Sequence, residues 1–184
     1  MLTEDEFYKK WRKFFRKYNY QGKVQYPGED ESDKVALIAI DDMPIEGINK
    51  MLSDILKATR GSSDLWLADT YERLPDFQGA KCIQGTKVAD TAWQSPFLGQ
   101  TLADASVWVR GIPKPPKAIN KRYFVVLKRE IFEKQGKVII CKALDGKKEP
   151  QAILYKIEEL GMWITSYNRH CWEQDYENYE ERYQ

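Results

Sequence analysis

"KVALIAI", residues 34–40, contains the longest apolar run in the chain of 184 residues, and Asp41 and Asp42 follow it directly. Its apolar residues do not alternate with polar ones, which is typical of a strand that is covered on both faces. Residues 44–59 (PIEGINKMLSDILKAT) then repeat apolar side chains at helical spacing, and residues 65–69 (LWLAD) read as a second strand. Together these segments predict a βαβ unit, or a helix packed on an antiparallel sheet.

The rest of the chain adds shorter elements. Candidate strands are residues 80–84 (AKCIQ), 105–111 (ASVWVRG), 122–128 (RYFVVLK), 137–144 (KVIICKAL) and 162–168 (MWITSYN). We expect 122–128 and 137–144 to pair antiparallel, Asp145-Gly146 to make a tight turn, and residues 151–160 to form a helix rather than a strand. The predicted fold class is α+β, with α/β as the alternative, and its sheet is mixed or mainly antiparallel.

The predicted organisation has a terminal segment on each side of one folded core. Residues 1–27 are interpreted as a basic amphipathic helix and linker, residues 28–171 as the α+β core, and residues 172–184 as an acidic, aromatic tail. Thr3 and Glu6 have the spacing of a capping box, which predicts that a helix begins there. Its apolar side chains fall on one arc, opposite the basic ones.

Composition excludes several classes of protein. Hydrophobic residues make up 42% of the chain, which is too many for a disordered protein, and 29 basic residues nearly balance 28 acidic ones. The three cysteines are odd in number and widely spaced, so they indicate neither a disulfide framework nor a zinc ribbon. The N-terminus does not resemble a signal peptide, and no apolar run is long enough to cross a bilayer. We therefore expect a cytoplasmic protein with no membrane partner.

Catalysis has little support in the sequence. The chain has one histidine, His170, and lacks the glycine motifs of nucleotide-binding proteins, so we expect no cofactor and, on balance, no enzyme. One catalytic alternative places Asp41, Asp42 and Asp69 at neighbouring strand ends, where they would hold Mg²⁺ for phosphodiester cleavage. The competing interpretation is that Asp42 caps the helix that follows it.

Two basic stretches predict a nucleic-acid partner. The first belongs to the N-terminal helix and consists of Lys9, Lys10, Arg12, Lys13, Arg16 and Lys17. The second lies within twenty residues that contain no acid and consists of Arg110, Lys114, Lys117, Lys121, Arg122, Lys128 and Arg129. Because cations that meet phosphates release counterions, such stretches favour binding that is independent of base sequence. The sequence thus predicts a small non-catalytic accessory protein that binds nucleic acid or a nucleoprotein assembly.

The C-terminal tail supports an alternative function. Residues 173–181 hold five acidic residues, no basic residue and two tyrosines. They are suited to a protein partner, with Trp163 and Trp172 as possible anchors, and the chain would then be an inhibitor or an assembly subunit. The same acids would instead neutralise the basic helix if the two segments met within one molecule.

Overall fold

The structure is a computed structural model that describes residues 34–58, 65–71, 91–113, 119–165, 172 and 176–177. All of them belong to the second of the two parts into which the chain divides, Met1–Glu31 and Ser32–Gln184. The predicted N-terminal helix, the candidate strand at residues 80–84 and most of the tail lie outside the described residues.

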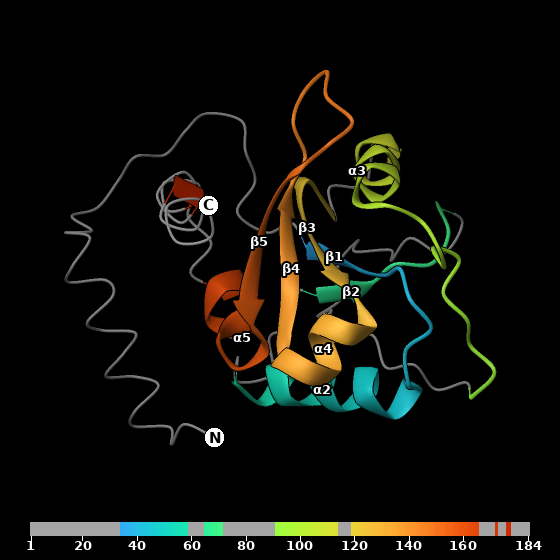
Figure 1. The fold of residues 1–184 in the computed structure, drawn as a ribbon, viewed down its shortest axis with the longest axis vertical. Coiled ribbons are helices and arrows are strands. Elements are labelled where there is room, and N and C mark those ends of the chain that lie inside the picture. Colours follow the sequence, from blue (N-terminus) through green and yellow to red (C-terminus); the bar gives the residue numbers. More distant parts are fainter. Residues whose placement is uncertain are drawn as a thin grey trace, which may run out of the picture. The chain divides into compact units, whose positions relative to one another are not determined.

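The described part of the chain is built on a mixed sheet of five strands in the order β2-β1-β3-β4-β5 (Figure 1). The strands are β1 Lys34–Ala39, β2 Leu65–Leu67, β3 Ile119–Leu127, β4 Lys137–Lys142 and β5 Gln151–Lys156. Strand β1 pairs in parallel with both β2 and β3, whereas β4 pairs antiparallel with β3 and with β5. The predicted α+β class, the βαβ unit and the antiparallel pair are confirmed.

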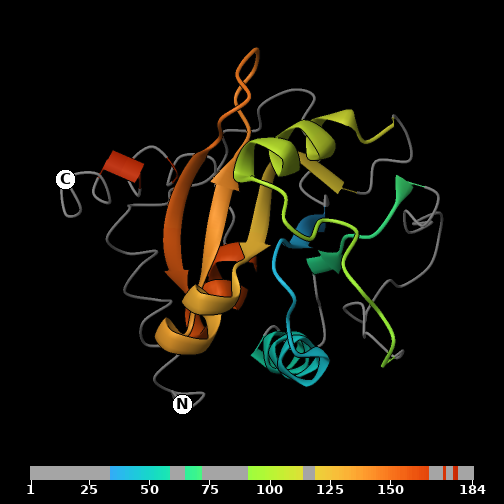
Figure 2. The same ribbon diagram turned by 45° about the vertical axis from the view of Figure 1, so that its right-hand side comes forward.

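Helices cover both faces of this sheet (Figure 2). They are α2 Ile45–Ala58, α3 Leu102–Gly111, α4 Arg129–Gln135 and α5 Ile157–Thr165. The side chains of α2 and α5 join one core cluster and those of α3 join the other, so α3 lies on the opposite face from α2. None of the described helices is long and apolar enough to span a membrane.

Alternate residues of the central strands point into the two cores. Leu37 and Val125 pack with α2 on one face, while Ile38 and Phe124 pack with Val109 of α3 on the other. Successive side chains of a strand point to opposite faces, so a strand that is covered on both sides needs an unbroken apolar run. The prediction that residues 34–40 contain a strand covered on both faces is therefore confirmed by β1.

Residues 105–111 belong to helix α3, and the prediction of a strand there was wrong. The helix begins after Thr101, whose side chain accepts a hydrogen bond from the Asp104 amide while the Asp104 carboxylate accepts one from the Thr101 amide. This reciprocal cap fixes the first turn, and the aliphatic and aromatic residues after it then pack as one helical face. The T-x-x-D pattern of residues 101–104 is the sequence signal that could have predicted the start of this helix.

The C-terminal elements also differ from the prediction. The expected helix at residues 151–160 is strand β5 followed by the start of α5, and residues 162–165, expected in a strand, complete that helix. Pairing with β4 holds β5 extended along its whole length. Beyond it, Leu160, Trp163 and Ile164 recur at helical spacing and are buried in the same core as α2. Gly146, in the predicted turn, has a positive φ of 70°.

Candidate functional site

The order of the strands identifies where a ligand site is expected. Strands β2 and β3 lie on opposite sides of β1, and the helices that follow β1 and precede β3 lie on opposite faces. In open α/β sheets this reversal leaves a crevice outside the carboxyl ends of the two strands. We call the carboxyl ends of β1 and β3 the switch-point end; α2 and α4 lie beside it, at the lower end of the sheet in Figure 1.

Asp41 has a structural role at the switch-point end. Its Oδ2 atom accepts a hydrogen bond of 2.8 Å from the main-chain amide of Arg129, the first residue of α4. Lys128, at the N-cap position of that helix, makes no side-chain capping bond. The Asp41 carboxylate, which follows β1, therefore provides the capping acceptor that an N-cap side chain normally provides. The Ile40 amide also donates to the Leu127 carbonyl at 3.1 Å, which fixes β1 against β3.

The three carboxylates of the predicted magnesium site do not form one. Asp41, Asp42 and Asp69 are all described, and no group of three or more His, Cys, Asp or Glu residues in the described ranges has an arrangement that holds a metal ion. Asp42 instead contacts Arg129 through its main-chain carbonyl, at 3.4 Å from Nη1. The geometry required by the phosphodiesterase alternative is therefore missing, because its ligands do not converge.

Cys141 is the cysteine that the structure describes, and it is buried with a free thiol. Burial raises the pKa of this thiol far above its ordinary value, because the thiolate would be deprived of water. A nucleophilic cysteine needs the opposite shift and access to substrate. Cys141 is therefore a core residue of β4.

Residues 93–99 are hydrogen-bonded to the carboxyl end of β1. The Ser95 hydroxyl donates to the Ala39 carbonyl at 2.5 Å, and the Gly99 amide donates to the Ile40 carbonyl at 2.9 Å. Trp93 packs against the core on the α2 side, whereas Phe97 is buried in the core on the α3 side. This segment lies at the edge of the sheet where open α/β sheets bind their ligands.

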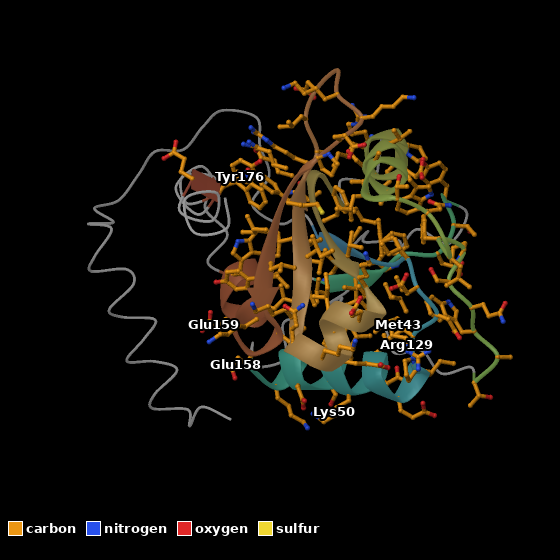
Figure 3. The ribbon with its side chains drawn as sticks, viewed as in Figure 1. Met43, Lys50, Arg129, Glu158, Glu159 and Tyr176 are labelled. Atoms are coloured by element: carbon orange, nitrogen blue, oxygen red, sulfur yellow. The ribbon has the colours of Figure 1, made fainter. Side chains whose placement is uncertain are left out.

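A cavity of about 280 Å³ remains beside this segment, on the side of α2. It is lined by Asp42, Met43, Ile45, Glu46, Thr91, Ala92, Trp93 and Gln94. Figure 3 labels Met43 of its lining and Arg129 at the end of the sheet where α4 lies. Sequence analysis did not identify Glu46, Trp93 or Gln94 as residues of a site. They come from separate segments of the chain, and no sequence motif or periodicity shows that these segments lie side by side in the fold.

Basic residues gather at the other end of the sheet. Arg110 at the end of α3 donates from Nη1 to the Leu144 carbonyl at 3.1 Å, and the Ala143 amide donates to the Arg122 carbonyl at 2.7 Å. These two bonds join α3, β3 and the loop after β4. The Lys121 ammonium donates to the carbonyl of Ile112, in the segment that leaves α3. Arg110, Lys121 and Arg122 thus lie around the amino end of β3.

The β4–β5 loop adds two lysines that sequence analysis did not assign to the basic surface, Lys147 and Lys148. Both are exposed, and the Lys147 amide donates to the same Leu144 carbonyl that Arg110 contacts. We call Arg110, Lys121, Arg122, Lys147 and Lys148 the basic end; its loop is the uppermost part of the sheet in Figure 1. Asp104 lies near enough for Lys148 to affect it. The pKa of Asp104 is lowered chiefly by its hydrogen bonds with Thr101 and less by the Lys148 charge.

The second predicted basic stretch is divided by β3. Lys128 and Arg129 follow the carboxyl end of this strand, whereas Arg110, Lys121 and Arg122 surround its amino end. Arg129 also pairs with Glu133 at 3.0 Å. The interpretation of all seven residues as one surface was therefore wrong. Lys114, Lys117 and the basic residues between Lys9 and Lys17 lie outside the described residues.

The tryptophans proposed as anchors for a partner are part of the core. Trp163 and Trp172 are 8% and 2% exposed. The indole of Trp172 donates to Gln151 Oε1 at 2.9 Å, and its ring stacks with that of Tyr176 at 6.2 Å between centroids. Residue 172 therefore belongs to the fold, and neither indole is an exposed anchor.

Comparisons of the chain with protein-family models, with curated proteins and with solved structures found no match.

Proposed function

We propose that this chain is a non-catalytic accessory protein that binds the phosphate backbone of nucleic acid through its basic end. The observation that carries the proposal is the convergence of cations from three separate segments: Arg110 from α3, Arg122 from β3, and Lys147 and Lys148 from the β4–β5 loop. None of these four forms an ion pair with a carboxylate of the described residues. A cytoplasmic location is part of the same proposal.

The hydrogen bonds within the basic end leave its charge in place. Arg110 donates to the main-chain carbonyls of Ser106 and Leu144, which are neutral acceptors. Arg122 is exposed, with its guanidinium carbon 5.7 Å from the centroid of the Tyr123 ring. A guanidinium held by carbonyls is oriented and remains cationic, which suits it to contact phosphate oxygens.

Such a surface predicts affinity without base specificity. Each phosphate contact changes the slope of log affinity against log salt by about 0.7 for single strands and about 0.9 for duplex DNA. Five cations would therefore give a slope of at most about −3.5 to −4.5 from the basic end alone. The basic residues of 9–17, with Lys114 and Lys117, would add to this slope if they reach the same nucleic acid.

The test is a titration of labelled 25-nucleotide single strands and duplexes of DNA and RNA with the full-length chain, followed by fluorescence anisotropy between 50 and 200 mM salt. In the double variant Lys147→Gln/Lys148→Gln we expect weaker binding to every sequence and a slope reduced in magnitude by about 1.4 for single strands and about 1.8 for duplexes, because two phosphate contacts are lost. Both lysines are exposed, so the substitutions should leave the fold intact.

The matched control is Lys57→Gln/Lys128→Gln, which removes the same charge from exposed positions away from the basic end. It should leave the slope within about 0.5 of the wild type, because these lysines are not expected to contact phosphate. Equal slopes for the two double variants would contradict the proposal, as would the absence of binding by the wild type at 50 mM salt. Variants of Lys9 to Lys17 that alone abolish binding would place the interface elsewhere.

A further inference from the structure

The cavity beside residues 93–99 is small for a ligand site but has room for a single side-chain head group. Sites for drug-sized ligands occupy about 300–1,000 Å³, and this cavity of about 280 Å³ lies at the lower limit. Its floor includes Met43, which is 6% exposed, and its walls come from the first turn of α2 and from residues 91–94. It is therefore a hollow in the folded core unit, suited to one compact group.

Two carboxylates without a cationic partner line this cavity. The side chains of Asp42 and Glu46 form no hydrogen bond or ion pair within the described part of the chain. The nearby cations are already engaged: Arg129 Nε contacts Glu133 at 3.0 Å, and Lys50 Nζ contacts Asp54 at 2.7 Å. The cavity lining thus carries two exposed carboxylates that form no ion pair with a described residue, and Arg129 Nη1 lies 3.4 Å from the main-chain carbonyl of Asp42.

The other two polar members of the lining fit the same kind of ligand. The ring of Trp93 is half-buried against the α2 core but makes no ring contact with another described aromatic residue. Tryptophan offers the strongest face for a cation, and arginine uses it most often. The Gln94 side chain forms no hydrogen bond among the described residues, so its amide oxygen is available as an acceptor.

We infer that this cavity binds a guanidinium group, with Asp42 and Glu46 as its carboxylate partners and Trp93 as the surface on which it stacks. A guanidinium is planar, keeps its charge and donates several hydrogen bonds in one plane, which matches a lining of carboxylates, an amide and an aromatic ring. The site is separate from the basic end. Its failure in a test would leave the proposed nucleic-acid function unaffected, and the reverse also holds.

The probe is ethylguanidinium chloride, titrated into the isotope-labelled full-length chain while the indole N–H signal of Trp93 is followed by NMR. The variant Trp93→Phe assigns that signal. We expect a saturable shift of the Trp93 signal, and N-ethylurea, which has nearly the same shape but no charge, should cause none. Affinity should weaken by about two- to fivefold for Asp42→Asn or Glu46→Gln alone, as for exposed ion pairs, and by about tenfold for both.

The matched control is Asp145→Asn/Glu149→Gln, which removes two exposed carboxylates from the β4–β5 loop and should leave the affinity unchanged. Acetyl-arginine amide and free arginine distinguish the two sources of such a group. Tighter binding of the amide, which lacks a carboxylate for Asp42 and Glu46 to repel, would assign the site to an arginine of a protein partner. An equal response to N-ethylurea, or an unchanged affinity in Asp42→Asn/Glu46→Gln, would overturn the inference.

Discussion

The basic end and the switch-point end are opposite ends of the same strand, β3, and they carry opposite chemistry. At its amino end, α3, β3 and the β4–β5 loop bring together cations, four of which (Arg110, Arg122, Lys147 and Lys148) form no ion pair with a carboxylate of the described residues. At its carboxyl end, Asp41 caps α4, Arg129 pairs with Glu133, and Asp42 and Glu46 line a cavity. One end therefore fits an anionic partner and the other a cationic group.

This difference shows how a strand separates charges that are neighbours in the sequence. Arg122 and Arg129 are seven residues apart, which in an extended chain corresponds to roughly 23 Å. That distance exceeds the Debye length of about 8 Å at physiological salt, so the two arginines do not act as one electrostatic surface. Lys147, by contrast, is distant from Arg110 in the sequence but shares the Leu144 carbonyl with it.

The largest effect is expected where the two ends are joined, at the middle of β3. Phe124 is fully buried and lies opposite Ala36 of β1 and Cys141 of β4. In Phe124→Ala we expect the free energy of unfolding in urea to fall by about 3–5 kcal/mol, because the variant loses apolar burial and leaves a cavity. Leu98→Ala, at an exposed position, is the control and should change it by less than about 0.5 kcal/mol. A loss below about 1 kcal/mol for Phe124→Ala would contradict the packing.

The next effect concerns the switch-point end alone. Asp41→Ala removes the acceptor that caps the Arg129 amide, so we expect the free energy of unfolding to fall by about 1 kcal/mol. The adjacent Asp42→Ala removes a carboxylate without a hydrogen-bond partner in the described residues and should stay within about 0.5 kcal/mol of the wild type. Equal losses in the two variants, measured by urea denaturation, would contradict the capping role of Asp41.

A related effect is expected at α3, near the basic end. Thr101→Ala removes the hydroxyl that donates to Asp104 Oδ2 and keeps the main-chain amide of residue 101 as a donor, so the pKa of Asp104 should rise part of the way toward its ordinary value. Lys148→Gln should raise the same pKa by a smaller amount, because the charge of Lys148 is the lesser cause. NMR titration of the Asp104 carboxyl measures both changes, and a larger rise in Lys148→Gln than in Thr101→Ala would contradict this assignment.

The sign of the pH effect follows from the lowered pKa. The hydrogen-bonded Asp104 carboxylate contributes stability above the pKa of the unfolded chain, and this contribution is lost as the pH falls through the lower pKa of the folded chain. Stability of the wild type should therefore decrease on acidification through this range, and Thr101→Ala should show less of that decrease. Urea midpoints measured between pH 2 and pH 6 would test it.

The smallest effect is expected inside α3. The Ser106 hydroxyl is buried on the face that meets the sheet and has no hydrogen-bond partner in the described part of the chain. In Ser106→Ala we expect the free energy of unfolding to stay unchanged or to rise by up to about 1 kcal/mol, since a buried unpaired hydroxyl is replaced by a better helix former. A fall of more than about 0.5 kcal/mol would show that the hydroxyl has a partner.

The sequence predicted the elements whose pattern is local and strong. The β1–α2–β2 unit and the β3–β4 pair follow from unbroken apolar runs and a clear helical period. The sequence analysis assigned residues 105–111 to a strand, because their apolar residues suit a strand as well as the helix α3 that they form. It assigned residues 151–160 to a helix, but pairing with β4 holds the first part of them in strand β5. Of the residues predicted for the basic site, Arg110, Lys121 and Arg122 lie around the amino end of β3, whereas Lys147 and Lys148 come from the β4–β5 loop. Trp93 and Glu46 of the cavity were not predicted.

What the amino-acid sequence determined was a nearly neutral, globular α+β chain whose first described strand is buried on both faces, because composition and apolar runs are properties of short segments. Only the tertiary structure decided which charges meet. It assigned Asp41 to a helix that begins 88 residues later, divided one basic stretch between two ends of a strand, and placed Asp42 beside Trp93. Electrostatic and hydrogen-bonding partners are set by distance in space, which the sheet order and the helix packing establish.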